Sequence, residues 1–178
     1  QIKAYSQFGP QQIISNDSFG FAKIRTADLD NDGDLDIYLA GSLDISWFEN
    51  TNGLGLFGSK QIITETEWEW ANSVSASDLD GDGDLDILSS FSGEFPGVSK
   101  IAWNENLDGQ GNFGPQQIIS LDIISVFTII GVDIDNDSDS DVLIIERNAD
   151  RVAWYENIDG QGTFGSKITI STDLDWPI

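Results

Sequence analysis

The stretch DLDNDGDLD at residues 28–36 places five aspartates in nine positions, with an asparagine and a glycine between them. The same pattern returns as DLDGDGDLD at residues 78–86 and as DIDNDSDSD at residues 133–141. Because the three copies begin at residues 28, 78 and 133, the chain consists of a repeating unit of about 50 residues.

Two more signatures follow every aspartate loop. The first is Trp-x-Glu-Asn, at residues 47–50, 103–106 and 154–157. The second is a glycine-rich turn ending in Phe-Gly, at residues 57–58, 113–114 and 164–165, with a further Phe-Gly at residues 8–9. Residues 8–15 are repeated letter for letter at residues 113–120. Since the tryptophan recurs at one position of the unit, we expect it to pack between neighbouring units.

The first unit predicts β-structure throughout. Strands are expected at residues 21–26, 35–39, 45–49 and 58–63, separated by turns rich in Gly, Asn and Asp. No stretch keeps the 3.6-residue apolar period of a helix over three turns. Each unit is therefore predicted to form one four-stranded antiparallel sheet.

A sheet of about 50 residues cannot bury both faces alone, whereas stacked copies can. The prediction is an all-β fold of β-propeller blades, in preference to a solenoid, whose repeats are usually shorter, or a string of sandwiches, whose units are longer. The expected divisions are a surplus strand at residues 8–15, blade one at about 20–64, blade two at about 71–120, blade three at about 126–171, and a tail at 172–178.

Three blades are fewer than the 4–8 or so with which propellers close. Either the chain assembles with copies of itself, or it is cut from a longer array. We expect a homo-oligomer, a dimer that closes a six-bladed ring.

Composition excludes several classes of protein. The 178 residues are 39% hydrophobic, as in globular domains, but 31 acidic residues against 8 basic ones give a net charge of −23. This charge argues against nucleic-acid binding and against docking on an anionic membrane, and no apolar run is long enough for membrane insertion. With neither cysteine nor histidine, disulfides, zinc–thiolate sites and Ser–His–Asp triads are excluded.

The aspartate loops predict sites for a hard divalent cation. Five carboxylates so close together repel one another unless an ion neutralises them. Calcium accepts six to eight oxygens in flexible geometry, while magnesium demands an octahedron and retains water, so calcium fits better. An EF-hand would place a glutamate at loop position 12, where this chain has Leu39, Ser89 and Ile144. Purely solvated acidic turns are the alternative, but 15 of the 31 acids fall in these three windows.

Together, the loops, the Trp-x-Glu-Asn signature and the Phe-Gly turns resemble the FG-GAP/VCBS repeats of extracellular calcium-binding β-propellers, which include integrin α-subunit propellers. The resemblance implies three Ca²⁺ sites, with side-chain ligands from loop positions 1, 3, 5 and 9 and a backbone carbonyl from position 7. These positions are Asp28, Asp30, Asp32, Asp34 and Asp36; Asp78, Asp80, Asp82, Asp84 and Asp86; and Asp133, Asp135, Asp137, Asp139 and Asp141.

The third loop departs from this pattern because Ser138 replaces the glycine of position 6. A left-handed backbone at a serine costs about 1 kcal/mol, so we expect the third site to be weaker. Extracellular calcium modules bind with dissociation constants of about 10⁻⁴–10⁻³ M. Cytosolic calcium is far too low for such sites, which together with the resemblance predicts an extracellular or cell-surface location.

A ligand site is expected where the copies differ, because function on a repeat fold concentrates there. The connection at residues 65–70 and the longer loop at residues 92–97 have no equivalents in the other units. Their candidate ligand residues are Trp68, Trp70, Glu69, Glu94 and Phe95. They could stack on and hydrogen-bond to a sugar, or simply fill a junction between blades.

Three functions remain open on the sequence. The first is a calcium-stabilised binding or scaffolding module with a glycan or protein ligand and no catalytic residues. The second is a fragment of a secreted carbohydrate-active enzyme, which the lack of histidine and of an identifiable carboxylate dyad argues against. The third is a self-assembling repeat without a small ligand.

Overall fold

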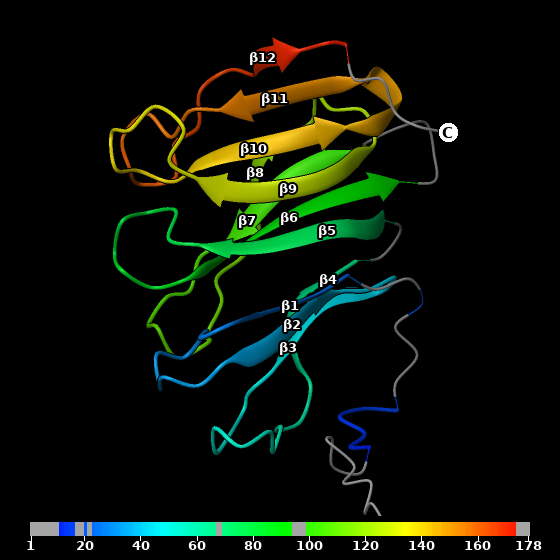
Figure 1. Ribbon diagram of the computed structural model, residues 1–178, viewed down its shortest axis with the longest axis vertical. Helices are drawn as coiled ribbons and strands as arrows, with labels where there is room; N and C mark the ends of the chain where they lie inside the picture. Colours follow the sequence, from blue (N-terminus) through cyan, green and yellow to red (C-terminus); the bar gives the residue numbers. More distant parts are fainter. Residues whose placement is uncertain (1–10, 17–19, 21–22, 67–68, 94–98, 174–178) are drawn as a thin grey trace, which may run out of the picture.

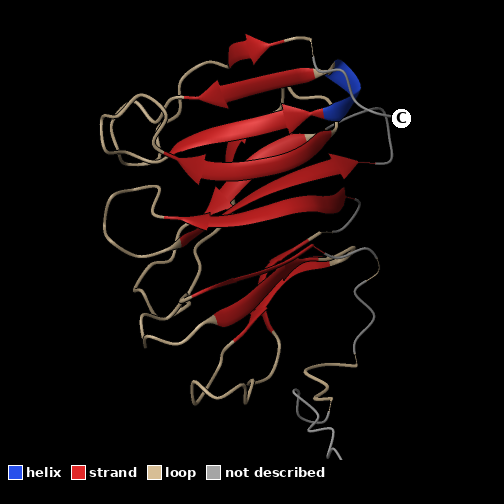
Figure 2. Ribbon diagram, viewed as in Figure 1, coloured by secondary structure: helices blue, strands red, loops and turns tan. Residues whose placement is uncertain are grey.

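A computed structural model describes residues 11–173 apart from residues 17–19, 21–22, 67–68 and 94–98. Within these residues the protein is all β, and its one helical element is the single 3₁₀ turn η1 (Arg147–Ala149) (Figures 1 and 2). None of the described helices is long and apolar enough to cross a membrane.

In the part of the chain that the structure describes, twelve strands form three separate four-stranded antiparallel sheets, as the repeat predicted. Blade one contains β1 (Lys23–Ala27), β2 (Asp36–Ala40), β3 (Asp44–Phe48) and β4 (Gln61–Glu65). Blade two contains β5 (Glu69–Ser77), β6 (Asp86–Gly93), β7 (Lys100–Asn104) and β8 (Gln117–Ser120). Blade three contains β9 (Val126–Val132), β10 (Asp141–Glu146), β11 (Arg151–Tyr155) and β12 (Ile168–Ser171). Each sheet pairs its strands in chain order.

The prediction of a surplus strand at residues 8–15 is wrong for the described part of this segment. Of residues 8–15, the first three lie outside the described residues, and residues 11–16 are irregular rather than a strand. The physical reason lies in their sequence, which duplicates residues 113–120 and hence β8, an outermost strand. An outermost strand needs the three inner strands of its own blade, and each blade of this chain already has its fourth strand.

Blades one and two stack face to face. Strand pleating turns alternate residues to opposite faces, so the cross-strand neighbours Tyr38 and Trp47 share the face toward blade two. They pack in one buried cluster with Val74, Ile87 and Phe91 of that blade. Figure 1 shows the sheets as successive layers, in which β5 lies beside both β1 and β9.

The second junction repeats the first. Leu88 and Trp103 of blade two are buried against Ile129, Ile144 and Ala153 of blade three. The prediction that the repeated tryptophans pack between units is thus confirmed for the first two of them. Stacking leaves the three aspartate loops, which join the first and second strands of each blade, along one edge of the molecule, at the left in Figure 1.

Candidate metal centre

Each aspartate loop is wound by hydrogen bonds from its own backbone to its own carboxylates. In the first loop the N–H of Asp32 donates to Asp30 (3.3 Å), the N–H of Asp34 to Asp32 (2.9 Å), and the N–H of Gly33 to Asp28 (3.0 Å). The second and third loops repeat all three contacts at the equivalent residues. The carboxylates of positions 1, 3 and 5 are therefore held by hydrogen bonds from within the loop.

The winding requires left-handed backbone at loop positions 4 and 6. Position 6 has φ angles of 92° at Gly33, 97° at Gly83 and 83° at Ser138, so the expected left-handed serine is present. Position 4 is also left-handed, with φ of 58° at Asn31 and 69° at Asn136. Asparagine tolerates this conformation better than most residues, a signal that the sequence carries and that our prediction did not use.

The position-9 aspartates anchor the loops to the blades. Both oxygens of Asp86 accept backbone hydrogen bonds, from Leu79 inside the loop (2.8 Å) and from Asn106 after β7 (2.9 Å). Asp36 and Asp141 make the same pair of bonds in their blades, and all three carboxylates are buried. These residues hold the ends of the loop together whether or not an ion is bound.

The position-7 carboxylates turn out of the loop. That of Asp34 lies against Gly53 in the turn before β4, where an added Cβ would sit 2.3 Å from one of its oxygens. Asp84 faces Gly109 in the same way and accepts a hydrogen bond from Asn31 of blade one (2.7 Å). Their side chains thus serve turns and blade contacts, which leaves the backbone carbonyl as their oxygen for the loop centre.

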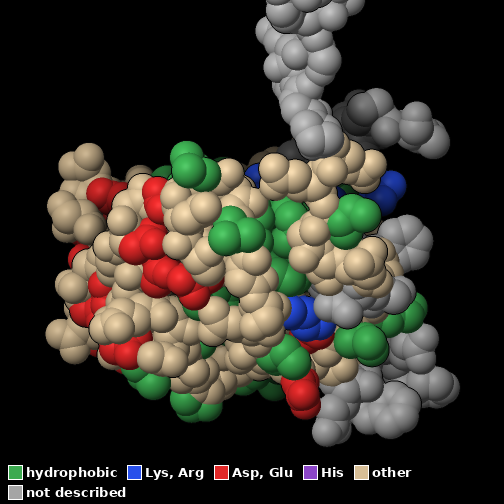
Figure 3. Space-filling model, turned by 90° about the horizontal axis from the view of Figure 1, so that it is seen from below, with side chains coloured by type: hydrophobic (Ala, Val, Ile, Leu, Met, Phe, Trp, Pro, Cys, Tyr) green, Lys and Arg blue, Asp and Glu red, His purple; other side chains and the backbone are tan. Residues whose placement is uncertain are grey.

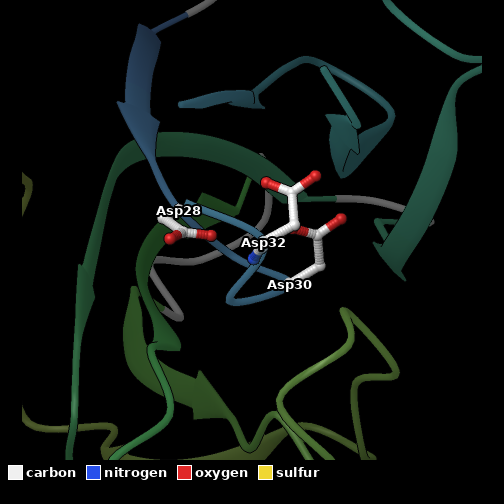
Figure 4. A group of neighbouring side chains, drawn as sticks. All are labelled: Asp28, Asp30 and Asp32. Carbon is white, nitrogen blue, oxygen red and sulfur yellow. Dashed lines mark hydrogen bonds between the residues drawn. The ribbon is translucent and has the colours of Figure 1, made fainter. Parts of the chain in front are cut away.

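Three acidic groups bring carboxylate oxygens within 4.8 Å of one another. Positions 1 and 3 belong to every group, joined by position 5 in the first loop and by position 9 in the other two. The groups are Asp28, Asp30 and Asp32; Asp78, Asp80 and Asp86; and Asp133, Asp135 and Asp141. Figure 4 shows the first group, with the carboxylates of Asp30 and Asp32 side by side. Asp36, Asp82 and Asp137 lie in the same loops but outside these groups.

The electrostatics of the loops favour a bound cation. Burial, reinforced by the neighbouring carboxylates, raises the pKa of Asp30 and of Asp80. Burial raises the pKa of Asp86 to about 7, against the lowering effect of its two backbone hydrogen bonds. The Oδ1 atom of Asp28 is buried and accepts no hydrogen bond from any described residue. A buried acceptor without a donor, among crowded carboxylates, is what a hard cation satisfies, so the residues fit calcium.

Two of the five candidate ligand residues, Glu69 and Trp70, are described, and they lie at the start of β5. Trp70 is 53% exposed and lines a cavity of about 490 Å³ together with Ser42, Ala71 and Asn72. Glu69 forms an ion pair with Lys100 (2.6 Å) within blade two. The remaining candidates, Trp68, Glu94 and Phe95, lie outside the described residues.

The sequence analysis did not predict a role for the asparagine that ends the Trp-x-Glu-Asn signature. The side-chain amide of Asn106 donates to the carbonyl of Leu29 in the first aspartate loop (2.9 Å), and that of Asn157 donates to the carbonyl of Leu79 in the second (2.8 Å). Each asparagine thus ties the loop of the preceding blade to its own blade. The recurrence of this residue was the available signal.

Comparisons with known proteins agree with this geometry. Residues 28–89, which hold the first two loops, match the FG-GAP-like repeat, so this segment is an FG-GAP-type repeat. No curated protein matches the sequence. A solved structure similar to this one is a lectin from Agrocybe aegerita that specifically recognises non-reducing terminal N-acetylglucosamine, with a TM-score of 0.58 and 20% identity. The match covers 86% of this chain and 39% of the lectin, and at this identity it establishes the fold alone.

Proposed function

We propose that this chain is a calcium-stabilised, extracellular β-propeller module that binds a glycan or protein ligand. The observation that carries the calcium part is the buried Oδ1 of Asp28, which has no donor in the first loop. The acidic group itself recurs in all three blades, although the equivalent Oδ1 atoms of Asp78 and Asp133 accept hydrogen bonds from Gly81 and Asn136. The ligands would be the aspartates of positions 1, 3, 5 and 9 with the carbonyl of position 7. The ion would supply the charge that the loops lack, and the loop residues hold it.

Calcium titration tests this proposal. Isothermal calorimetry on the chelator-treated protein should show three bound ions per chain. Asp30→Asn should remove one of them, because Asp30 belongs to the first acidic group and makes only a local hydrogen bond. Glu65→Gln on the exposed outer strand is the matched control and should leave all three. Absence of calcium binding at millimolar concentration would refute the calcium proposal.

We propose the extracellular location on the affinity expected of such sites. Loops of this kind bind calcium with dissociation constants of about 10⁻⁴–10⁻³ M, which only extracellular fluids saturate. At millimolar calcium each site then adds roughly 0.4–1.4 kcal/mol to the free energy of unfolding. A dissociation constant below about 10⁻⁶ M for all three sites would remove this reason for placing the protein outside the cell.

For the ligand, we propose a sugar bound in the cavity beside Trp70. Aromatic rings stack on the apolar faces of sugars, and Ser42 and Asn72 supply hydrogen-bonding groups in the same cavity. The similar lectin supports sugar binding by analogy of fold only. Glycan-array binding that Trp70→Ala abolishes, while Leu121→Ala on the exposed β8–β9 connection leaves it unchanged, would support the site. Equal binding by both variants would refute it.

We propose a binding module in preference to an enzyme because the acidic residues repeat in every blade and serve the loops that hold them. Incubation with polysaccharides should therefore give no turnover, whereas a released oligosaccharide would favour the carbohydrate-active enzyme.

We also propose that a second copy of the chain completes the ring of blades.

A further inference from the structure

The two outer faces of the blade stack differ from the inner ones at equivalent positions. Ile24 of β1 is 63% exposed, while its counterparts Val74 of β5 and Ile129 of β9 are fully buried against the preceding blade. Ile24 shares its face with Leu39, its cross-strand neighbour. Blade one therefore presents the surface that blades two and three use to receive a neighbour.

Blade three presents the opposite surface. Trp47 and Trp103 are buried at 2% and 3% exposure, but the equivalent Trp154 is only partly buried. In the aspartate loops, Leu29 and Leu79 are fully buried under the following blade, whereas the equivalent Ile134 is 36% exposed. The outer face of blade three thus carries Trp154 and Ile134, whose equivalents in blades one and two pack against the following blade.

The contact between blades depends on a tryptophan ring that lies on a glycine. The ring of Trp47 lies where a Cβ on Gly111 would be, 2.1 Å from its Cζ2 atom, and it meets Phe113 edge-on with 6.5 Å between ring centroids. Trp103 lies in the same way on Gly162, at 2.4 Å. No side chain could replace either glycine without moving the tryptophan.

Blade one has the equivalent glycine, Gly55, but no tryptophan of the described residues lies on it. Gly55, equivalent to Gly111 and Gly162, has a φ of 85°, and among the described residues a Cβ there would meet only the Gln12 side chain, at 4.0 Å. Phe57 follows it, as Phe113 follows Gly111.

Hydrogen bonds between blades show the same offset. Asn106 and Asn157 donate to loop carbonyls of the preceding blade, those of Leu29 and Leu79. Asn50 is their counterpart in blade one, and its amide donates to Leu35 within its own blade (3.3 Å). The counterpart carbonyl in the third loop is that of Ile134.

The N-terminal segment covers the receiving face only loosely. Residues 11–15 lie over Ile24, Ile37, Leu39 and Phe48 and enclose a groove of about 310 Å³ with them. Ile13, Ile14 and Ile24 stay exposed despite this cover. Figure 3 views the molecule from below, the side of blade one in Figure 1, and shows hydrophobic side chains there beside the acidic edge. A docked blade would bury Ile24, as the preceding blade buries the equivalent Val74 and Ile129, whereas the segment leaves it exposed.

We propose that a second copy of this chain docks head to tail on the first, displacing residues 11–15. Trp154 of one copy lies on Gly55 and Phe57 of the other, and the Asn50 amide donates to the Ile134 carbonyl. Two such contacts close a ring of six blades, inside the range of 4–8 or so that propellers adopt. The inference rests on the ring closure proposed above and is independent of calcium and sugar binding. Two copies related by a two-fold axis meet twice, so Trp154 of each copy contacts Gly55 of the other.

The first test is the mass of the chain in solution with millimolar calcium, by light scattering and sedimentation. The expected species has twice the 19.5 kDa chain mass. Ile24→Glu should abolish it, because the charge would enter the buried contact. Ile62→Glu is the matched control: Ile62 lies on the same sheet but is 53% exposed, and its blade-two counterpart Ile118 remains 52% exposed beside blade one. The control should keep the dimer.

The second test separates the pairing of the Trp154 face with the Gly55 face from an association through two like faces. Trp154→Ala damages one end and Gly55→Asn the other, so each variant alone should dimerise at least about tenfold more weakly. Mixing them should give a heterodimer that forms more readily than either variant alone, because Trp154 of the glycine variant meets an intact Gly55 on the tryptophan variant and both substitutions fall in the other contact. An unfolded variant would give no such rescue, and circular dichroism confirms the fold of each.

A monomeric wild-type chain, an open series of larger masses, or mixed variants that fail to associate would each overturn the proposal. Calcium stoichiometry measured on the same samples shows separately whether the metal sites have failed. A monomer that binds three ions would leave the calcium proposal standing and refute only the docking.

Discussion

The contact of Trp47 with Gly111 gives the most direct test of how the blades are held together. Gly111→Ala places a methyl group where Cζ2 of the ring lies 2.1 Å away, and the ring is 2% exposed and so has little room to move. Overpacking of this kind costs about 1–3 kcal/mol, and a left-handed alanine adds about 1 kcal/mol. We therefore expect the free energy of unfolding to fall by about 2–4 kcal/mol.

Gly55→Ala is the matched control because the backbone there is also left-handed, with φ of 85° against 75° at Gly111. Its methyl group meets no tryptophan, so only the backbone cost of about 1 kcal/mol should remain. Both variants are measured by urea unfolding, diluted until the chain is monomeric. Equal losses of stability would show that the tryptophan yields freely, and the argument from the tryptophan and glycine would be wrong.

Three further predictions concern the loops. Calcium should raise the melting temperature of the wild type. Asp82→Ala should reduce that increase by about one third, because it removes one of three sites, whereas Glu65→Gln should leave the increase unchanged. Scanning calorimetry in calcium and in chelator measures both effects. Burial raises the pKa of Asp36 and Asp86 above the ordinary 3.8, that of Asp86 to about 7, so their ionisation opposes folding. The metal-free protein should therefore lose stability as the pH rises from about 4 to about 7, and urea unfolding that shows a gain over this range would contradict the assignment. Ser138→Gly should relieve the left-handed serine, adding about 1 kcal/mol of stability and strengthening the third site, as calcium titration would show.

The sequence alone determined the repeat, the all-β blades and the three acidic loops, because each rests on local order. The carboxylates of positions 1, 3 and 5 are held by hydrogen bonds within nine residues, and positions 4 and 6 carry residues that accept a left-handed backbone. Strand positions followed from the same local pattern, although the fourth strand of blade one begins at Gln61 rather than at residue 58. The expected surplus strand failed because its pairing depends on a blade that the local sequence cannot supply.

Only the tertiary structure decided the role of each repeated residue. Trp47 and Trp154 stand in identical signatures, yet one is buried and the other lies on an outer face, because burial depends on whether another blade follows. Asp36 and Asp34 are two residues apart, yet one anchors the loop to β3 and the other turns toward Gly53. Such differences arise from contacts between residues far apart in the chain. Copies of a repeated residue have the same local sequence, so the sequence does not show which of them makes such a contact.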